Sequence, residues 1–156
     1  MPGLLDEFSG ITHELNQRSI DYAVCGGWAV AIHGFLRATL DIDLLILTRD
    51  LDKALEAARE KGFDIEGLPL NFDGGKTMIH RISKIDHLSK ELITLDLILV
   101  TDIYKDVWES RKRVIWNQGE YSIVSRNGLI KMKEISGRPK DIIDLDYLRG
   151  VDNDED

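Results

Sequence analysis

Residues 25–46 read CGGWAVAIHGFLRATLDIDLLI, and their pattern is the strongest indication of the fold. An apolar run ends at Cys25, two glycines and a short helix-like segment follow, and a second apolar run starts with two acids. Side chains two residues apart in a strand point to the same face, so Asp41 and Asp43 are expected to project side by side, while Ile42 enters a core. The order predicts a strand, a glycine turn, a helix and an acidic strand.

The two carboxylates repel each other and therefore need solvent around them or a cation between them. Mg²⁺ suits this role, because it prefers oxygen ligands and is typically held by one or two carboxylates together with substrate phosphates. Gly26 and Gly27 let a ligand approach the backbone closely, and N–H groups at the start of a helix attract anions. Each motif alone could be only a tight turn or a solvated strand start, but their order predicts phosphate and metal chemistry.

A third carboxylate, Asp96, lies within the apolar run of residues 92–100. An aspartate is costly to bury without a partner. Either this strand lies at a sheet edge with Asp96 in water, or Asp96 faces a metal or a cationic partner. Because the chain already contains a strand with two carboxylates, we expect Asp96 to join Asp41 and Asp43 in one site.

These motifs resemble those of the nucleotidyltransferase superfamily that includes DNA polymerase beta. The resemblance rests on Gly-Gly-Trp-Ala, His-Gly, Arg-x-Thr, Asp-Ile-Asp-Leu-Leu-Ile and the later strand aspartate. Within the superfamily the chain is most similar to a small bacterial branch, which includes lincosamide-type antibiotic nucleotidyltransferases and nucleotidyltransferase toxins of abortive-infection systems. The resemblance implies an α/β (α+β) fold in which helices flank a mixed sheet, with a C-terminal helix pair.

The resemblance also implies a role for each matching residue. Gly26 and Gly27 would hold the phosphates of a nucleoside triphosphate. Asp41 and Asp43 would bind two Mg²⁺ ions, for which Mn²⁺ could substitute, and Asp96 would bind the catalytic metal and orient or deprotonate the attacking hydroxyl. The implied reaction is attack on the α-phosphorus with pyrophosphate leaving, a displacement that two-metal sites support.

Two residues between the glycine turn and the acidic strand are further candidates for nucleotide binding. Arg37 could pair with Asp41 or Asp43 as a structural clamp, or it could contact a phosphate oxygen bidentately. Thr39 is also a candidate, although a threonine at the start of a strand often binds the backbone through its hydroxyl.

The C-terminal piece, residues 129–145, resembles the closing segment of the same branch. This similarity implies that Lys133 points its charge at the triphosphate from across the site. Arg138 and Asp141 could pair and fix the turn between two helices. The alternative for all three residues is a solvated helix pair with ordinary ion pairs between residues three apart.

The sequence also predicts the remaining elements. Helical spacing or helix-terminating residues indicate helices, and apolar runs between turn residues indicate strands. We expect helices over 4–18, 27–35, 51–61, 102–112, 126–136 and from 139 onward, strands over 21–25, 41–47, 76–85, 92–100, 114–116 and 121–124, and a loop over 68–75.

The chain has 156 residues and a net charge of −8. This length fits one domain, residues 1–150, followed by an acidic tail, residues 151–156, that we expect to be disordered. Proteins that track nucleic-acid phosphates usually carry a basic excess, so the charge argues against an extended polynucleotide as substrate. The single cysteine, Cys25, excludes an intrachain disulfide framework, and no apolar run is long enough for a membrane span, so we expect a cytoplasmic protein.

We therefore expect a metal-dependent nucleotidyltransferase that moves a nucleoside monophosphate from a triphosphate to a hydroxyl of an acceptor supplied in trans. The acceptor would be a small antibiotic-like molecule, a protein or the end of a tRNA. The alternative is a non-catalytic module of the same fold that holds a nucleotide or pairs with another protein, for example as a component of a toxin–antitoxin pair. An antitoxin, or a second copy of the chain in a homodimer, is a further candidate partner.

Overall fold

The structure is a computed structural model that describes residues 2–34 and 41–150. Within these ranges, none of the helices combines the length and apolar character that a membrane span requires. In chain order, with η for 3-10 helices, the elements are α1 (Pro2–Gln17), β1 (Ala23–Cys25), α2 (Gly26–Ile32), β2 (Asp41–Ile46), η1 (Thr48–Asp50), α3 (Leu51–Glu60), β3 (Ile65–Glu66), β4 (Leu70–Phe72), η2 (Asp73–Gly75), β5 (Thr77–Ile85), β6 (Leu92–Leu99), η3 (Asp102–Tyr104), α4 (Lys105–Glu109), β7 (Lys112–Trp116), β8 (Gly119–Ile123), α5 (Arg126–Ser136) and α6 (Pro139–Gly150).

The strands form one mixed sheet in the order β3-β5-β6-β2-β1-β8-β7, and β4 pairs with β5. The two acid-bearing strands, β2 and β6, are parallel neighbours inside this sheet. Parallel neighbours need a long connection, and here it contains α3 and the antiparallel strands β3, β4 and β5. Since β6 has β2 on one side and β5 on the other, the alternative that Asp96 lies on an edge strand is excluded.

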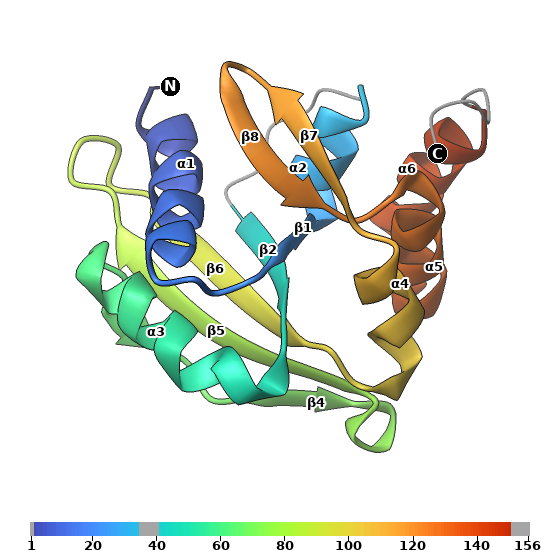
Figure 1. The fold of residues 1–156 in the computed structure, drawn as a ribbon, viewed down its shortest axis with the longest axis horizontal. Helices are drawn as coiled ribbons and strands as arrows, with labels where there is room; N and C mark the ends of the chain where they lie inside the picture. Colours follow the sequence, from blue (N-terminus) through green and yellow to red (C-terminus); the bar gives the residue numbers. More distant parts are fainter. Residues whose placement is uncertain (1, 35–40, 151–156) are drawn as a thin grey trace.

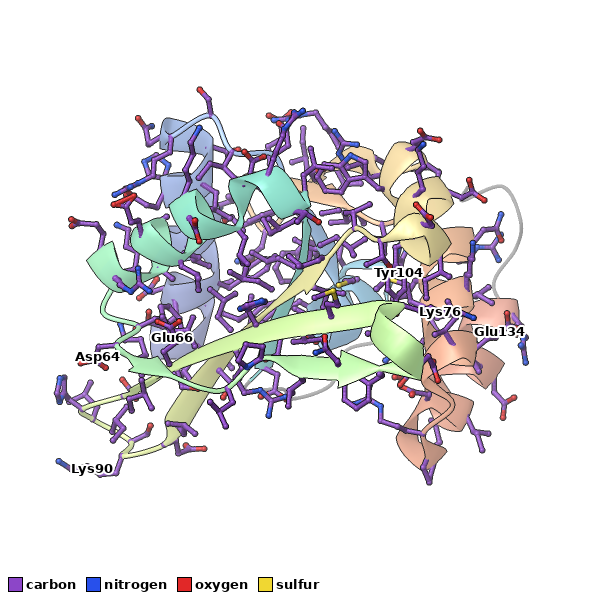
Figure 2. The ribbon with its side chains drawn as sticks, turned by 90° about the horizontal axis from the view of Figure 1, so that it is seen from below. Asp64, Glu66, Lys76, Lys90, Tyr104 and Glu134 are labelled. Carbon is purple, nitrogen blue, oxygen red and sulfur yellow. The ribbon has the colours of Figure 1, made fainter. Side chains whose placement is uncertain are left out.

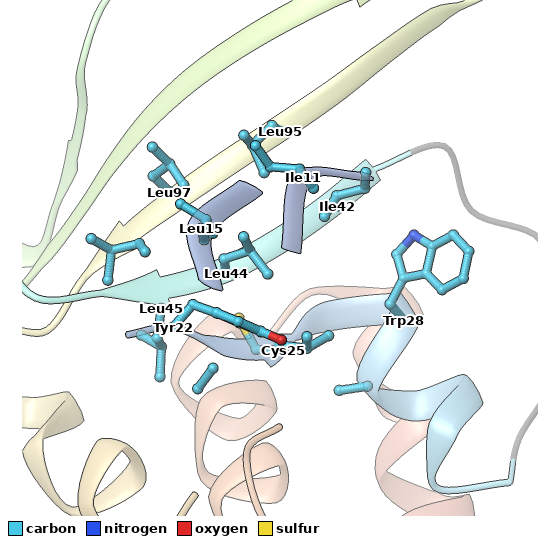
Figure 3. Close-up of a cluster of buried hydrophobic side chains, with 14 of the residues drawn as sticks. Ile11, Leu15, Tyr22, Cys25, Trp28, Ile42, Leu44, Leu45, Leu95 and Leu97 are labelled. Atoms are coloured by element: carbon cyan, nitrogen blue, oxygen red, sulfur yellow. The ribbon is translucent and has the colours of Figure 1, made fainter. Parts of the chain in front are cut away.

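Helices lie on both faces of the sheet, as the sequence predicts. On one side α1 packs with α3, and on the other α5 packs with α2, α4 and α6 (Figure 1). The apolar face of α1 lies against the centre of the sheet, where Ile11 and Leu15 meet the strand residues Ile42, Leu44, Leu95 and Leu97 (Figure 3). All six side chains are almost completely buried, and burial of each contributes roughly 1.5–3 kcal/mol to stability. This packing fixes which face of β2 remains for its acids.

An aromatic stack fixes α2, the helix that follows the glycine turn. Trp28 lies parallel to Phe8 of α1 with 4.3 Å between the ring centroids, and both side chains are buried. Trp116 from β7 contacts both rings edge-on. Offset and edge-on aromatic contacts add about 0.5–1.5 kcal/mol beyond the buried area. The stack therefore holds the start of α2, and with it Gly26, against the rest of the core.

Two strands are not predicted by the sequence. The segment 68–75, expected to be a loop, contains β4, and the two-residue strand β3 pairs with β5. Both are short and mostly exposed, so their side chains show little alternation. The strands expected over 114–116 and 121–124 are present as β7 and β8, which form a hairpin whose turn residues Asn117 and Gln118 both have positive φ, as a two-residue hairpin turn requires.

The C-terminal helix pair follows its sequence signals closely. Ser125 caps α5, because its Oγ accepts a hydrogen bond from the Gly128 N–H at 3.0 Å. Gly137 ends the helix with a left-handed φ of 61°, and Pro139 is the first residue of α6. The two helices pack against each other, which brings Lys133 on α5 next to the first turns of α6.

Candidate active site

Three charged side chains form a row across the centre of the sheet. In the strand register Asp43 on β2 is paired with Asp96 on β6, and Asp96 is paired with Arg81 on β5. Paired residues on neighbouring strands point to the same face and lie about 5 Å apart. The face they share is opposite to the one that packs on α1, so the row opens into the space beneath α5.

This row lies in a pocket of about 460 Å³. The glycine turn, the acids of β2 and β6, and the cations of α5 and the following turn line one part of it. The other part is apolar: Leu70 on β4, Ile79 on β5 and Ile98 on β6 are paired across the sheet, two residues along the strands from the charged row. At the far end lies Tyr104 (Figure 2). Its hydroxyl is 2.7 Å from Oγ1 of Thr77. A pocket of this size accepts a small molecule.

The glycine turn lies directly against one of the acids. Gly26 has a φ of +64°, and a Cβ placed on it would lie 2.0 Å from Oδ2 of Asp43. A side chain at this position is therefore excluded twice, by the backbone conformation and by the carboxylate. The close approach explains why glycine follows the buried Cys25 at the end of β1.

The carboxylate of Asp96 is bound by Arg81. Arg81 Nε donates to Oδ1 at 2.8 Å and Nη2 donates to Oδ2 at 3.0 Å, which is a bidentate pair. The Asp96 side chain is 9% exposed, whereas that of Arg81 is 47% exposed. Hydrogen bonding to Asp96 raises the pKa of Arg81 above its usual value. The sequence predicts that Asp96 faces a metal or a cationic partner, and in this structure it faces the cationic partner.

The positive charges near Asp43 do not balance the negative charges around it. Burial raises the pKa of Asp43 to about 7, and the negative charges of Asp96 and Asp41 act in the same direction. Lys133 and Arg138 oppose this rise only in part. The donor set thus has the character that a hard divalent cation requires, namely carboxylate oxygens with uncompensated negative charge.

Asp41 lies on the same face of β2 as Asp43, is exposed, and lines the same pocket. Nevertheless, within residues 2–34 and 41–150 no group of three or more His, Cys, Asp or Glu side chains is close enough to hold a metal ion. The structure therefore brings Asp43 and Asp96 together and places Asp41 near them. Arg37 and Thr39, the other two candidates near the acidic strand, lie outside the described residues.

A buried ion cluster forms the wall of the pocket on α5 and α6. Nζ of Lys133 lies 3.1 Å from Oδ1 of Asp141 and 3.0 Å from Oδ2 of Asp144, and all three side chains are at most 5% exposed. Arg138, which also lines the pocket, donates from Nε to Oδ2 of Asp141 at 3.1 Å. The pairing of Arg138 with Asp141, which the sequence offers, is present. Lys133 lines the pocket while it is held by two acids.

Sequence reasoning missed Arg81 and Asp144 as parts of this region, and it gave Arg138 only a structural pairing. Alternation along residues 77–85 places Arg81 on one face with Thr77 and Ile79, but its partner follows only from the register of β5 against β6. Similarly, Asp144 reaches Lys133 only because α6 folds back along α5.

Comparisons with known proteins place the fold. No protein-family model and no curated protein matches the sequence. Among solved structures, the lincosamide antibiotic adenylyltransferase LnuA with bound lincomycin has a TM-score of 0.62 and 14% identity, with 94% of this chain and 97% of that chain covered. The antibiotic-resistance factor ANT(2'')-Ia has a TM-score of 0.64 and 14% identity, with 92% and 81% covered. An antigenic nucleotidyltransferase-like protein from Paracoccidioides brasiliensis has a TM-score of 0.55 and 20% identity, with 93% and 74% covered.

These similarities extend over almost the whole chain and confirm the predicted resemblance to nucleotidyltransferases at the level of the fold. The mixed sheet flanked by helices, with its C-terminal helix pair, is the nucleotidyltransferase fold. Sequence identities of 14–20% establish shared architecture and leave activity to be argued from the site itself.

Proposed function

We propose that this chain is a metal-dependent nucleotidyltransferase that transfers a nucleoside monophosphate from a nucleoside triphosphate to an acceptor hydroxyl. The observation that carries the proposal is the in-register pair of carboxylates, Asp43 and Asp96, on adjacent parallel strands beside Gly26. The fold shared with LnuA and ANT(2'')-Ia supports it. A module that only binds nucleotide has little use for converging acids.

The residues present fit a divalent metal in their donor chemistry. Asp43 and Asp96 would hold the ion, with Asp41 as a further oxygen ligand, and Mg²⁺ or Mn²⁺ suits these donors. When bound, such a metal supplies a Lewis acid that polarises a phosphoryl oxygen and stabilises the charge of the leaving pyrophosphate.

The chain's own residues position the reactants. Gly26 carries no side chain that would keep a phosphate from the backbone of the turn, and Lys133 and Arg138 would face that phosphate from the opposite wall, where Asp141 and Asp144 balance their charge. In the reaction the acceptor oxygen forms a bond to the α-phosphorus while the bond between this phosphorus and the bridging oxygen of pyrophosphate breaks. The hydroxyl proton passes to a base, and we assign this role to Asp96.

The pocket favours a small amphipathic acceptor over a polynucleotide. Its apolar part, which includes Leu70 and Ile79, adjoins the row of Asp96 and Arg81, so an apolar body could lie there while a hydroxyl reaches the acids. A volume of about 460 Å³ suits a molecule of drug size. The net charge of −8 further disfavours an extended nucleic acid.

The test combines purified protein, each labelled nucleoside triphosphate, Mg²⁺ or Mn²⁺, and a panel of hydroxyl acceptors that includes antibiotics, tRNA and proteins. We expect pyrophosphate release and a labelled acceptor, and we expect Asp43→Asn and Asp96→Asn to abolish both. Asp52→Asn, an exposed change on α3, is the matched control and should leave turnover unchanged. Near-native activity in either site variant would refute the carboxylate mechanism. Nucleotide binding without transfer to any acceptor would instead favour a binding module.

A further inference from the structure

Arg81 and a metal ion would compete for the same two atoms. Both carboxylate oxygens of Asp96 accept hydrogen bonds from the Arg81 guanidinium, at 2.8 and 3.0 Å. A divalent ion held by Asp43 and Asp96 needs at least one of these oxygens. A guanidinium and a metal ion would also repel each other at this distance. A guanidinium that holds both oxygens occupies part of their lone pairs and repels the ion, so the bidentate pair opposes metal binding at Asp96.

We propose that Arg81 is a stand-in cation: it holds Asp96 in the metal-free protein and is exchanged for the divalent ion when the site is loaded. This inference rests on the metal site of the proposed function and adds a positioning residue to it. Arg81 keeps the buried carboxylate paired and oriented until the metal arrives, and it then turns away from Asp96.

The exposure of the two partners shows which of them moves. Asp96 lies on a central strand with a side chain that is only 9% exposed, so leaving it without a cation is costly. Arg81 is 47% exposed at the pocket wall, so its charged end can turn into solvent at little cost. The carboxylate is therefore the fixed member of the pair, and it needs one cationic partner at every stage.

The charge balance of the row points the same way. Asp43 and Asp96 together carry two negative charges, whereas Arg81 provides one positive charge and, among residues 2–34 and 41–150, its ion pair is with Asp96. A divalent ion between the two acids would neutralise both at once. The metal is thus the better counterion for the pair, and the arginine is sufficient for Asp96 alone.

The exchange is tested by Mn²⁺ binding without nucleotide, measured on the full chain from the electron paramagnetic resonance signal of free Mn²⁺. Arg81→Gln removes the competitor, so it should bind Mn²⁺ about 10-fold more tightly than the wild type, a conservative figure for one unit charge removed at about 4 Å from a partly exposed site. Arg81→Lys keeps the charge but cannot form the bidentate hydrogen bonds, so its Mn²⁺ affinity should lie between those of the wild type and Arg81→Gln. The double variant Arg81→Gln, Asp96→Asn should lose the gain.

The matched control is Arg113→Gln on β7, because Arg113 forms a comparable cross-strand pair with Glu120 at 3.0 Å, away from the pocket. Its Mn²⁺ affinity should equal that of the wild type. Unchanged or weaker Mn²⁺ binding by Arg81→Gln would mean that Arg81 only supports Asp96 and would overturn the exchange. Thermal unfolding of each variant checks that it is folded.

A second measurement uses the wild-type protein, in which Arg81 is present. In protein labelled with nitrogen-15, the Nε–H resonance of Arg81, assigned by its absence from Arg81→Lys, should exchange faster with water when Mg²⁺ saturates the site. Unchanged protection at saturation would also overturn the proposal. Neither experiment involves turnover. Tighter Mn²⁺ binding by Arg81→Gln in a chain that transfers no nucleotide would support the exchange and refute the proposed function, and active enzyme without that gain would refute the exchange alone.

Discussion

The ammonium group of Lys133 lies 3.0 Å from the carboxylate of Asp144 inside the α5–α6 pair, although both residues belong to helices that expose much of their surface. Asp141 completes the cluster at 3.1 Å from the same nitrogen. Two buried acids around one lysine leave a negative charge that Arg138 offsets from the rim of the pocket. The same charged residues therefore stabilise the packing of α5 on α6 and set the charge at this wall of the pocket.

We predict that Lys133→Met destabilises the protein strongly. Removing the central cation leaves two buried carboxylates without their main partner, and breaking a buried pair in this way typically costs about 3–5 kcal/mol. Urea unfolding measures the loss. Lys131→Met on the same helix is the control, because Lys131 is 41% exposed and lies 3.8 Å from an exposed aspartate, so its loss should change the unfolding free energy by under about 1 kcal/mol. Equal effects of the two changes would show that the cluster adds no stability.

The lowered pKa of Asp141 leads us to predict that the stability of the protein depends on pH. Burial alone would raise the pKa of Asp141, but hydrogen bonds from Arg138, Ser136 and Lys133 outweigh burial and lower the pKa to about 2. Because the folded-state pKa lies below the usual 3.8, this group stabilises the fold fully above about pH 4, and the contribution is lost as the pH falls through about 2. The contribution is on the order of 2 kcal/mol.

The measurement is the free energy of unfolding between pH 2 and pH 7 for the wild type and for Asp141→Asn. The variant should be less stable at neutral pH, and the two curves should converge toward pH 2. Asp64→Asn, in an exposed loop away from α5 (Figure 2), should run parallel to the wild type. A constant difference between wild type and Asp141→Asn across the range would contradict the assignment of this acid-sensitive step to Asp141.

Local signals in the sequence were sufficient for several elements. The alternation in residues 41–46 predicts which face of β2 is acidic, because period two is a property of any strand. Gly137 and Pro139 predict the break between α5 and α6, because each residue permits only certain backbone angles. These features need no knowledge of distant contacts, and the structure confirms them.

Other features depend on how distant segments meet, so the sequence could not supply them. The strand β4 follows Pro69 and precedes two glycines, and only pairing with β5 makes it a strand. The contact of Arg81 with Asp96 depends on the register of one hairpin, where a shift by one residue would send Arg81 to the opposite face. The partners of Lys133 likewise depend on the packing of two helices.

The apolar part of the pocket predicts a separation of acceptor binding from nucleotide binding. Phe72 on β4 lines the pocket and is 50% exposed, so Phe72→Ala should weaken acceptor binding through lost contact area without unfolding the chain. We expect the KM for an acceptor found in the screen to rise about 10- to 100-fold, since the lost burial is worth roughly 1.5–3 kcal/mol. The Kd for the nucleoside triphosphate should remain unchanged. Ile115→Ala, an 82% exposed change on β7, is the control. A rise in the nucleotide Kd instead would place the base, and not the acceptor, on this wall.

We predict that adding a single methyl group at Gly26 both destabilises the protein and displaces Asp43. Gly26→Ala places a Cβ 2.0 Å from Oδ2 of Asp43 and forces a non-glycine residue to a φ of +64°. The carboxylate must then move, because no Cβ tolerates such a distance and the backbone beneath it is fixed by the Trp28 stack. We expect a loss of about 1–3 kcal/mol of stability from the backbone strain alone.

We also expect a loss of Mn²⁺ binding similar to that of Asp43→Asn, because the displaced carboxylate no longer faces Asp96. The matched control is Gly10→Ala in α1, where a Cβ meets no atom within 4 Å and the helical backbone accepts alanine. That change should stabilise the protein by about 0.5–1 kcal/mol, because alanine is the better helix former. If Gly26→Ala retains both stability and Mn²⁺ affinity, the Asp43 carboxylate can move away from residue 26 and still bind the metal, and the prediction is wrong. If the variant loses Mn²⁺ affinity while it remains folded, the position of Asp43 beside the glycine turn is what the metal requires.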